Sequence, residues 1–218
     1  MSGAAGIPGH VMGALGRAAR HDAPFRHWLL EDALPDGVAH AIAALPFAPP
    51  DIGDTEGRRE THNSSRRFFS VENRAGFPVC ESVAAAFQGE AVTGCLAAET
   101  GVDLSGSYLR IEYCQDSDGF WLEPHTDIGA KLFTMLVYLS DGPEAEGWGT
   151  DIYDGGKRHV GAAPGGFNKG VIFVPGADTW HGVEKRTFGG VRKSIIVNYV
   201  KPEWRSRHEL AYPERPID

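Results

Sequence analysis

The sequence contains little cysteine. Only three occur in 218 residues, at Cys80, Cys95 and Cys114, and no two of them have the Cys-x-x-Cys spacing. An odd number without paired spacing argues against a disulfide framework and is typical of a protein from a reducing compartment. We therefore expect three reduced thiols.

Long apolar runs are also missing. No segment reaches the roughly 20 apolar residues that a membrane-spanning helix needs. Residues 1–20 are rich in Gly and Ala, but they lack the charged stretch followed by an apolar stretch that defines a signal peptide. We therefore expect a cytoplasmic protein that does not associate with membranes.

There is no excess of basic residues. The formal net charge is −8 and the isoelectric point is about 5.6. Binding to nucleic acid generally requires a basic face, so nucleic acid is not an expected partner. A small anionic substrate held by a local arginine cluster remains compatible with this charge. No internal repeat or low-complexity tract is visible, and the sequence does not define an oligomeric state.

The composition is that of a globular domain, with 42% hydrophobic and 23% charged residues. At this length the usual expectation is one domain. The first 106 residues have mixed character, with more helical than strand-like patterns. We expect helices over 11–20 and 35–46, a short strand or entry segment over 25–30, a strand over 68–71, and one or two helices over 77–100.

From Ser107 the apolar period becomes strand-like. Turns rich in Gly, Pro and Asp separate the apolar segments, and many short strands of this kind favour a double-sheet jelly roll or barrel. We expect eight strands, over 108–114, 121–126, 131–140, 150–153, 157–160, 171–174, 179–184 and 193–200.

Three residues within this region form a candidate metal site. His125 and Asp127 are two apart, which on a strand places both side chains on one face, and His181 follows 56 residues after His125. Two histidines and one carboxylate on one side of a metal leave the opposite side open. That arrangement suits non-heme Fe(II), which needs vacant positions for O2 and a chelating cosubstrate. A barrel of the same shape with another metal, or with none, remains an alternative.

A candidate anion site follows on the last strand. Arg192 comes eleven residues after His181, and Ser194 is two residues further on and faces the same way. A guanidinium matches a carboxylate in bidentate geometry and does not lose its charge. Arg192 and Ser194 are therefore suited to bind a carboxylate.

The order of these features resembles the Fe(II)/2-oxoglutarate-dependent dioxygenases, most closely the prolyl-hydroxylase-like branch. The resemblance rests on a strand, His125-x-Asp127, several strands, His181 and then Arg192-x-Ser194, and it covers roughly 107–200. It implies a mainly β (α+β) fold with a double-stranded β-helix core of the jelly-roll, cupin-like type. The single domain would then have an N-terminal arm and helical support over 1–106, the core over 107–200 and a C-terminal tail over 201–218. The implied cofactors are Fe(II), 2-oxoglutarate as cosubstrate and O2, with ascorbate as a supporting reductant.

The resemblance adds further cosubstrate residues. It implies that Arg192 and Ser194 bind the distal carboxylate of 2-oxoglutarate and that the phenol of Tyr138 also reaches this group. It also implies that Tyr113 lines the cosubstrate or substrate pocket. Asn198 faces inward six residues after Arg192, and we expect it to contact the metal-side end of the cosubstrate. Core packing is the alternative role for both tyrosines.

Candidate substrate residues lie outside these motifs. Arg66 and Arg67, beside an aromatic pair, end an arginine-rich segment over 58–67 that is a candidate lid for an anionic group. Its alternative is a solvated charged loop. Trp121 and Glu123 share the phase of His125 and are expected to line the same cavity, and Trp148, in a glycine-rich turn, is expected to close over it.

The function implied is hydroxylation of an unactivated C–H bond of a small molecule, with succinate and CO2 as co-products. An amino acid, a sugar or a natural-product intermediate would qualify. The carboxylate of Asp127 favours hydroxylation, because family members that halogenate have Gly or Ala there. Desaturation, ring closure, peptidyl or prolyl hydroxylation and a non-catalytic cupin-like binding module remain open. The substrate and the oxidised position are not defined by the sequence.

Overall fold

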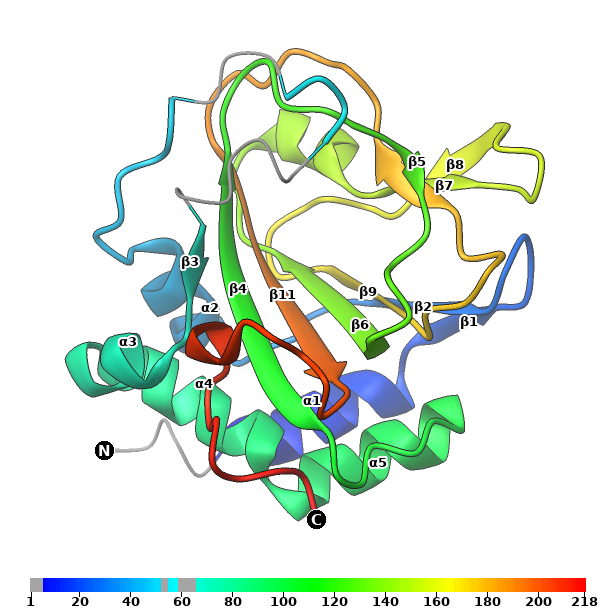
Figure 1. Cartoon of the computed structure of the whole chain (residues 1–218). Helices are drawn as coiled ribbons and strands as arrows, with labels where there is room; N and C mark the ends of the chain where they lie inside the picture. Colours follow the sequence, from blue (N-terminus) through cyan, green and yellow to red (C-terminus); the bar gives the residue numbers. More distant parts are fainter. Residues whose placement is uncertain (1–5, 52–54, 59–65) are drawn as a thin grey trace.

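The computed structural model describes residues 6–51, 55–58 and 66–218, and its strands form two antiparallel sheets (Figure 1). The larger sheet has the order β1-β2-β9-β6-β11-β4-β3, and the smaller has the order β5-β10-β7-β8. The strands are β1 Ala19–His21, β2 His27–Leu30, β3 Arg67–Phe68, β4 Tyr108–Asp116, β5 Leu122–His125, β6 Lys131–Tyr138, β7 Asp151–Tyr153, β8 His159–Ala162, β9 Gly170–Phe173, β10 His181–Val183 and β11 Arg192–Val200.

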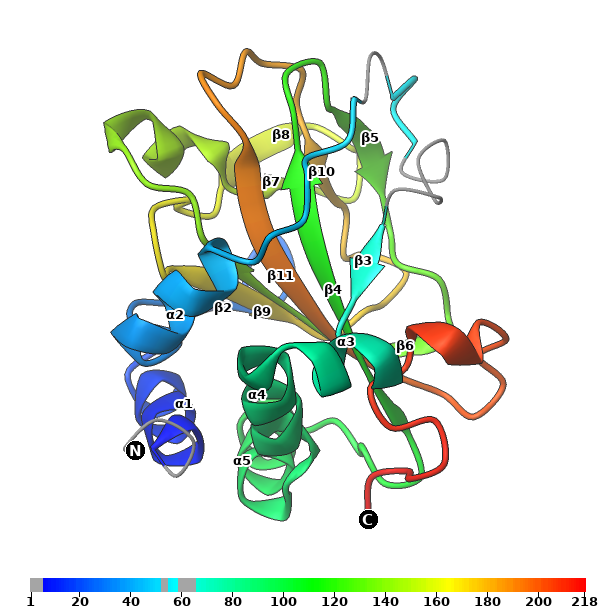
Figure 2. The same cartoon turned by 90° about the vertical axis from the view of Figure 1, so that its left-hand side faces the viewer.

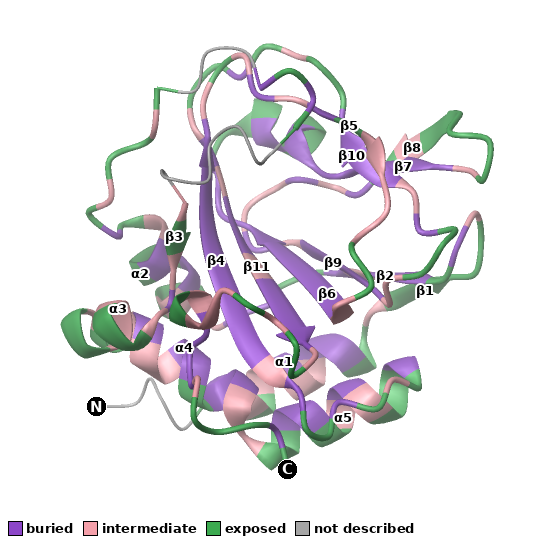
Figure 3. Cartoon of the chain, in the orientation of Figure 1, coloured by how far each residue is buried: buried purple, intermediate pink, exposed green. Residues whose placement is uncertain are grey.

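Helices cover the face of the larger sheet that is turned away from the smaller sheet (Figures 1 and 2). Side chains of the central strands, such as Ile111, Val197 and Tyr199, pack there against apolar residues of the helices, and Figure 3 shows the central strands as buried. The α-helices are α1 Ile7–Gly16, α2 Asp36–Ala43, α3 Val71–Gly76, α4 Pro78–Gln88 and α5 Glu90–Thr100, and the 3-10 helices are η2 Pro143–Trp148 and η3 Arg207–Glu209.

The eight strands expected after Ser107 are all present, with ends shifted by two residues at most. The segment over 77–100 forms two helices, because Gly89 between them has extended backbone angles, and α5 ends at Gly101 in the left-handed conformation. Four short elements of the described chain were not expected: β1, α3, η2 and η3. The prediction of a strand over 68–71 is wrong at its C-terminal end. The side chain of Ser70 accepts a hydrogen bond from Asn73 N and caps α3, which starts at Val71.

The two end regions are integrated into the fold. Strand β2 pairs with β9, so the first 106 residues contribute to the larger sheet. At the other end, Leu210, Ala211 and Ile217 are buried, and Ala211 N donates to Leu109 O of β4. The segment after β11 is therefore packed against the sheet. No helix in the described part of the chain is long and apolar enough to cross a membrane.

Candidate functional site

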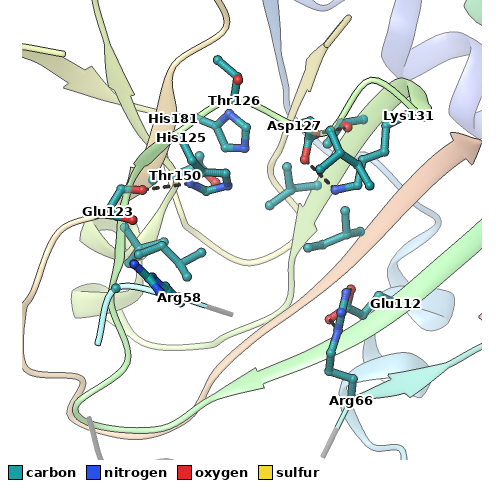
Figure 4. A pocket seen from close by; sticks show the side chains of 18 of the residues that line it. Arg58, Arg66, Glu112, Glu123, His125, Thr126, Asp127, Lys131, Thr150 and His181 are labelled. Atoms are coloured by element: carbon teal, nitrogen blue, oxygen red, sulfur yellow. Dashed lines mark hydrogen bonds and ion pairs between the residues drawn. The ribbon is translucent and has the colours of Figure 1, made fainter. Parts of the chain in front are cut away.

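The two sheets meet at the predicted metal residues. Strands β5 and β10 are hydrogen-bonded neighbours, and His125 at the end of β5 is in register with His181 at the start of β10. Asp127 lies two residues beyond β5. One potential ligand atom from each of the three side chains lies within 4.8 Å of the others, and the two imidazole centroids are 4.4 Å apart (Figure 4). The structure therefore brings the three predicted ligands together.

Both histidines are held with one ring nitrogen turned to the backbone. The Nδ1 atom of His125 is 2.9 Å from Glu123 O, and the Nδ1 atom of His181 is 2.9 Å from Thr179 O. A carbonyl oxygen can only accept, so each Nδ1 carries the proton and each Nε2 keeps a lone pair for a metal. Burial lowers the pKa of His181 to about 4, which keeps this imidazole neutral near pH 7.

Asp127 is held as an ionised carboxylate. Its Oδ1 is 2.6 Å from Lys131 Nζ, and its Oδ2 accepts a hydrogen bond of 2.7 Å from Thr134 Oγ1. Burial alone would raise the pKa of this carboxyl. The opposite effect of Lys131, His181 and the Thr134 hydroxyl prevails, and the pKa is held well below its usual range. Two imidazoles and one carboxylate are a donor set that suits Fe(II).

A cavity of about 340 Å³ opens beside the three residues. Its wall combines residues of both sheets: His125 and His181 come from the smaller sheet, and Thr134, Arg192 and Ile196 from the larger. Figure 4 shows the Arg66–Glu112 pair on the opposite side of this cavity from the two histidines. A bound molecule there would contact the metal residues and both sheets.

Arg192 and Ser194 leave buried donors without partners. Arg192 Nη1 donates to Asp116 Oδ2 over 2.6 Å, and Arg192 Nε donates to Trp148 O. Arg192 Nη2 and Ser194 Oγ are buried and have no hydrogen-bond partner within the described segments. Buried polar atoms are rarely left unsatisfied. Two such donors on one face of β11 fit an anionic oxygen group, as the distal carboxylate of 2-oxoglutarate would supply.

Tyr138 lies close to this pair. Its hydroxyl donates to Thr150 Oγ1 over 2.8 Å and accepts from Thr150 N over 3.0 Å, and the Arg192 guanidinium carbon is 5.6 Å from the ring centroid. Thr150 lines the cavity. The structure places Tyr138 beside Arg192 but not on the cavity wall, and its hydroxyl is bonded to Thr150. The expected contact of the phenol with the distal carboxylate stays a prediction.

The expectation that Tyr113 lines the pocket is wrong. Tyr113 lies on β4 between Glu112 and Cys114, and its side chain faces the helices. Its hydroxyl is 3.4 Å from Ala43 O, and its ring packs near Phe47 at 6.0 Å between centroids. The preceding residue, Glu112, lies on the opposite face of β4 and lines the cavity.

Asn198 faces inward, but it does not line the cavity. Its amide donates to Thr134 Oγ1 and Phe133 O, and its carbonyl accepts from Arg110 Nη1. The expected contact with the cosubstrate is therefore replaced by contacts with residues behind the cavity wall.

Two of the five candidate substrate residues line the cavity, Arg66 and Glu123. Arg66 makes a bidentate ion pair with Glu112, with N–O distances of 2.9 and 2.6 Å. Arg67 is exposed on the edge strand β3 and is not on the wall. Residues 59–65 of the proposed lid lie outside the described residues.

The two tryptophans were also expected at the cavity, and both expectations are wrong. Trp121 packs against Gly57, where an added Cβ would lie 2.9 Å from the indole ring. Trp148 is buried against Phe188, at 5.4 Å between ring centroids, and it reaches the site only through the carbonyl that accepts from Arg192. Trp148 is therefore a core residue, whereas Trp121 is partly buried.

Sequence reasoning did not identify several residues at or behind the wall. Lys131, Thr134 and Trp204 line the cavity, and Arg110 lies behind Glu112, to which it donates over 3.0 Å. A signal for Glu112 was available, because alternation along β4 places it on the face opposite Tyr113. Thr134 and Trp204 had no comparable signal.

Solved structures of oxygenases share this fold. A prolyl-4-hydroxylase from Pseudomonas putida matches with a TM-score of 0.57 at 14% identity, over 89% of this chain and 99% of its own. A prolyl hydroxylase from Trichoplax adhaerens, in complex with a hypoxia inducible factor oxygen degradation domain peptide fragment, has a TM-score of 0.58 at 12% identity over 89% of each chain. The non-heme alpha ketoglutarate dependent epimerase SnoN from nogalamycin biosynthesis has a TM-score of 0.54 at 14% identity, over 89% of this chain and 81% of its own.

No protein-family model matches the chain, and no curated protein matches it by sequence. At 12–14% identity the likeness to the solved structures is a likeness of fold. The chain has the fold of the 2OG-Fe(II) oxygenases, with a double-stranded β-helix core and antiparallel sheets. The predicted fold class and the resemblance to the prolyl-hydroxylase-like branch are confirmed at that level.

Proposed function

We propose that this protein is an Fe(II)- and 2-oxoglutarate-dependent oxygenase that hydroxylates an unactivated C–H bond of a small molecule. The observation that supports it most is that two features lie together. His125, Asp127 and His181 offer a metal donor set at the cavity, and Arg192 also lines this cavity. The buried donors of Arg192 and of Ser194, two residues further along β11, lack a partner among the described residues. A non-catalytic binding module would give these donors no shared purpose.

The residues of the site have separate proposed roles. His125, Asp127 and His181 would hold Fe(II), with Nδ1 of each imidazole kept protonated by a backbone carbonyl. Arg192 and Ser194 would bind and orient the distal carboxylate of 2-oxoglutarate. When bound, Fe(II) would supply oxidation by O2. One oxygen atom of O2 would enter the succinate that forms, with CO2, from 2-oxoglutarate, and the other would become the new hydroxyl group of the substrate. Apolar wall residues such as Leu136 and Ile196 would limit the access of water.

The size of the cavity favours a small substrate. Its volume of about 340 Å³ lies near the lower end of the range, roughly 300–1,000 Å³, for sites that bind small molecules. A peptide substrate is the competing proposal, and its support is the fold shared with prolyl hydroxylases, one of them solved with a peptide fragment.

Succinate release tests the proposal. The protein would be incubated with Fe(II), ascorbate and 2-oxoglutarate against free and N-acylated amino acids, sugars, nucleotides and proline-containing peptides. We expect stimulation by one small-molecule class, lost in His181→Ala and kept in His40→Ala, a control because His40 is an exposed histidine on α2.

Each other outcome has a distinct meaning. Stimulation by peptides alone would replace the small-molecule proposal with the peptidyl one. Slow release that no compound stimulates would keep the oxygenase and place the substrate outside the panel. No release from protein with bound iron would favour the binding module.

A further inference from the structure

A row of buried polar side chains leads across the larger sheet to Asp127. Asn198 on β11 is in register with Arg110 on β4 and with Thr134 on β6, so three neighbouring strands place these residues side by side. Arg110, Thr134 and Asn198 are each at most 2% exposed. The row ends at the carboxylate of Asp127, which accepts from Thr134 over 2.7 Å.

We infer that Asn198 and Thr134 are positioning residues for Asp127, and that Arg110 fixes the direction of the hydrogen bonds between them. This inference rests on the proposed role of Asp127 as a metal ligand. It assigns Asn198 a role behind the cavity wall, where sequence analysis expected a contact with the cosubstrate.

The direction of the hydrogen bonds follows from which groups can donate. A guanidinium has donors only, so the Asn198 oxygen must face Arg110 Nη1, at 3.1 Å. The Asn198 amide nitrogen then faces Thr134 Oγ1 at 2.9 Å and Phe133 O at 3.2 Å. Because the Thr134 hydroxyl accepts from Asn198, its single hydrogen is directed to Asp127 Oδ2.

Arg110 is itself fixed from two sides. It donates to Glu112 Oε2 over 3.0 Å and to Glu209 Oε2 over 2.5 Å. Glu209 belongs to η3, in the segment after β11 that packs over β4 (Figure 1). The C-terminal segment is thus connected to a metal-ligand residue through four successive hydrogen bonds.

A held carboxylate is useful at a metal site. The hydrogen bond to Oδ2 restricts rotation of the Asp127 carboxylate, and outer partners of this kind orient ligands and support metal affinity. Loss of such a partner typically costs about 10–100-fold in metal affinity. The row should therefore be measurable in metal binding alone, without turnover.

Binding of Mn(II) alone tests the inference. The electron paramagnetic resonance signal of the free ion measures how much Mn(II) is bound. Asn198→Asp keeps the shape and the partner for Arg110 but cannot donate to Thr134, so the Thr134 hydrogen is shared between two carboxylates. We expect Asn198→Asp and Thr134→Val each to weaken Mn(II) binding about ten-fold or more. Thr134→Ser keeps the hydroxyl and should bind Mn(II) like the wild type.

Asn168→Asp is the matched control. Asn168 is also buried and also donates and accepts, but its partners are the backbone groups of Leu34. Its variant should leave Mn(II) affinity unchanged. Thermal melting of each variant without metal identifies those that fold, and Thr134→Val decides alone if Asn198→Asp does not fold.

Two results would overturn the inference and leave the metal site intact. They are wild-type affinity in both Asn198→Asp and Thr134→Val, and an equal loss in Asn168→Asp. Absence of Mn(II) binding by the wild-type protein is a different failure, because it would remove the metal site itself and, with it, the ligand to be positioned.

Discussion

The buried polar residues of this protein are of two kinds. Ser107, Thr134 and Asn198 are fully or nearly fully buried and have hydrogen-bond partners in the fold. Ser194 Oγ and Arg192 Nη2 are buried without a partner in the part of the chain that the structure describes. A buried hydroxyl without a partner costs about 1–3 kcal/mol, so such groups are informative about ligands.

Ser194→Ala should therefore separate binding from stability. Removal of the unpaired hydroxyl should leave the melting temperature of the ligand-free protein unchanged or slightly raised. Binding of 2-oxoglutarate to the Mn(II)-loaded protein should weaken by about five- to ten-fold, because one hydrogen bond contributes roughly 1 kcal/mol. Isothermal titration calorimetry and thermal melting give the two quantities.

Ser107→Ala is the control for this prediction. Ser107 is as buried as Ser194, but its hydroxyl donates to Leu104 O, far along the chain from the site. It should lose stability and keep its affinity for 2-oxoglutarate. If Ser194→Ala binds 2-oxoglutarate like the wild type, Ser194 is not part of the cosubstrate site.

Residue chemistry and spacing were sufficient to predict that His125, Asp127 and His181 lie together. The two-residue spacing of His125 and Asp127 at the end of a strand needs no knowledge of the neighbouring strands. The role of Asn198 could not be predicted in the same way, because its partners Arg110 and Thr134 come from strands whose register the sequence does not specify. A contact that depends on register is visible only in the folded chain.

At the scale of elements, strand β4 explains the error over Tyr113. Eight of its nine residues are buried, since helices cover one face and the cavity region covers the other. A strand buried on both sides shows little alternation between apolar and polar residues. The sequence then defines which residues share a face, but not which face lies toward the cavity and which toward the helices. Arg110 and Glu112 then occupy the face that Tyr113 was expected to share.

The strand pair β5 and β10 has little space for side chains at Gly182. A Cβ added there would lie 2.8 Å from Leu122 O and 3.2 Å from Glu123 O, both backbone atoms. Gly182→Ala should push the two strands apart and so separate His181 from His125. We expect Mn(II) affinity to fall at least ten-fold and stability to fall by about 1–3 kcal/mol.

Gly155→Ala provides the comparison for Gly182→Ala. Gly155 lies between β7 and β8, and an added Cβ would meet no atom within 4 Å. This variant should bind Mn(II) and melt like the wild type. Equal Mn(II) affinity in Gly182→Ala and the wild type would show that the spacing of β5 and β10 does not control the site.

At the scale of the whole molecule, the site joins the two sheets. His125 and His181 belong to the smaller sheet, whereas Arg192 and Ser194 belong to the larger, and Asp127 is held by Thr134 of the larger sheet. The sequence predicted both sets of residues and the strands that hold them. It did not predict that β2 pairs with β9 in the larger sheet, or that the segment after β11 packs against β4. Both contacts join residues that are far apart in the sequence.

A site that joins two sheets should stabilise the whole fold when it is filled. A ligand present at 100 times its dissociation constant adds about 2.7 kcal/mol to the free energy of unfolding. For a chain of this size that corresponds to a rise of roughly 5–10 °C in melting temperature. We expect this rise with Mn(II) and 2-oxoglutarate together, measured by thermal melting under nitrogen.

The controls for this last prediction separate the two binding partners. His181→Ala should lose most of the rise because the metal is no longer held, whereas Ser194→Ala should keep the part due to Mn(II) and lose part of that due to 2-oxoglutarate. Mg²⁺ prefers oxygen ligands and should replace Mn(II) poorly at two imidazoles. An equal rise in the wild type and in His181→Ala would place the bound ligands elsewhere on the molecule, because the shared cavity between the sheets requires that imidazole.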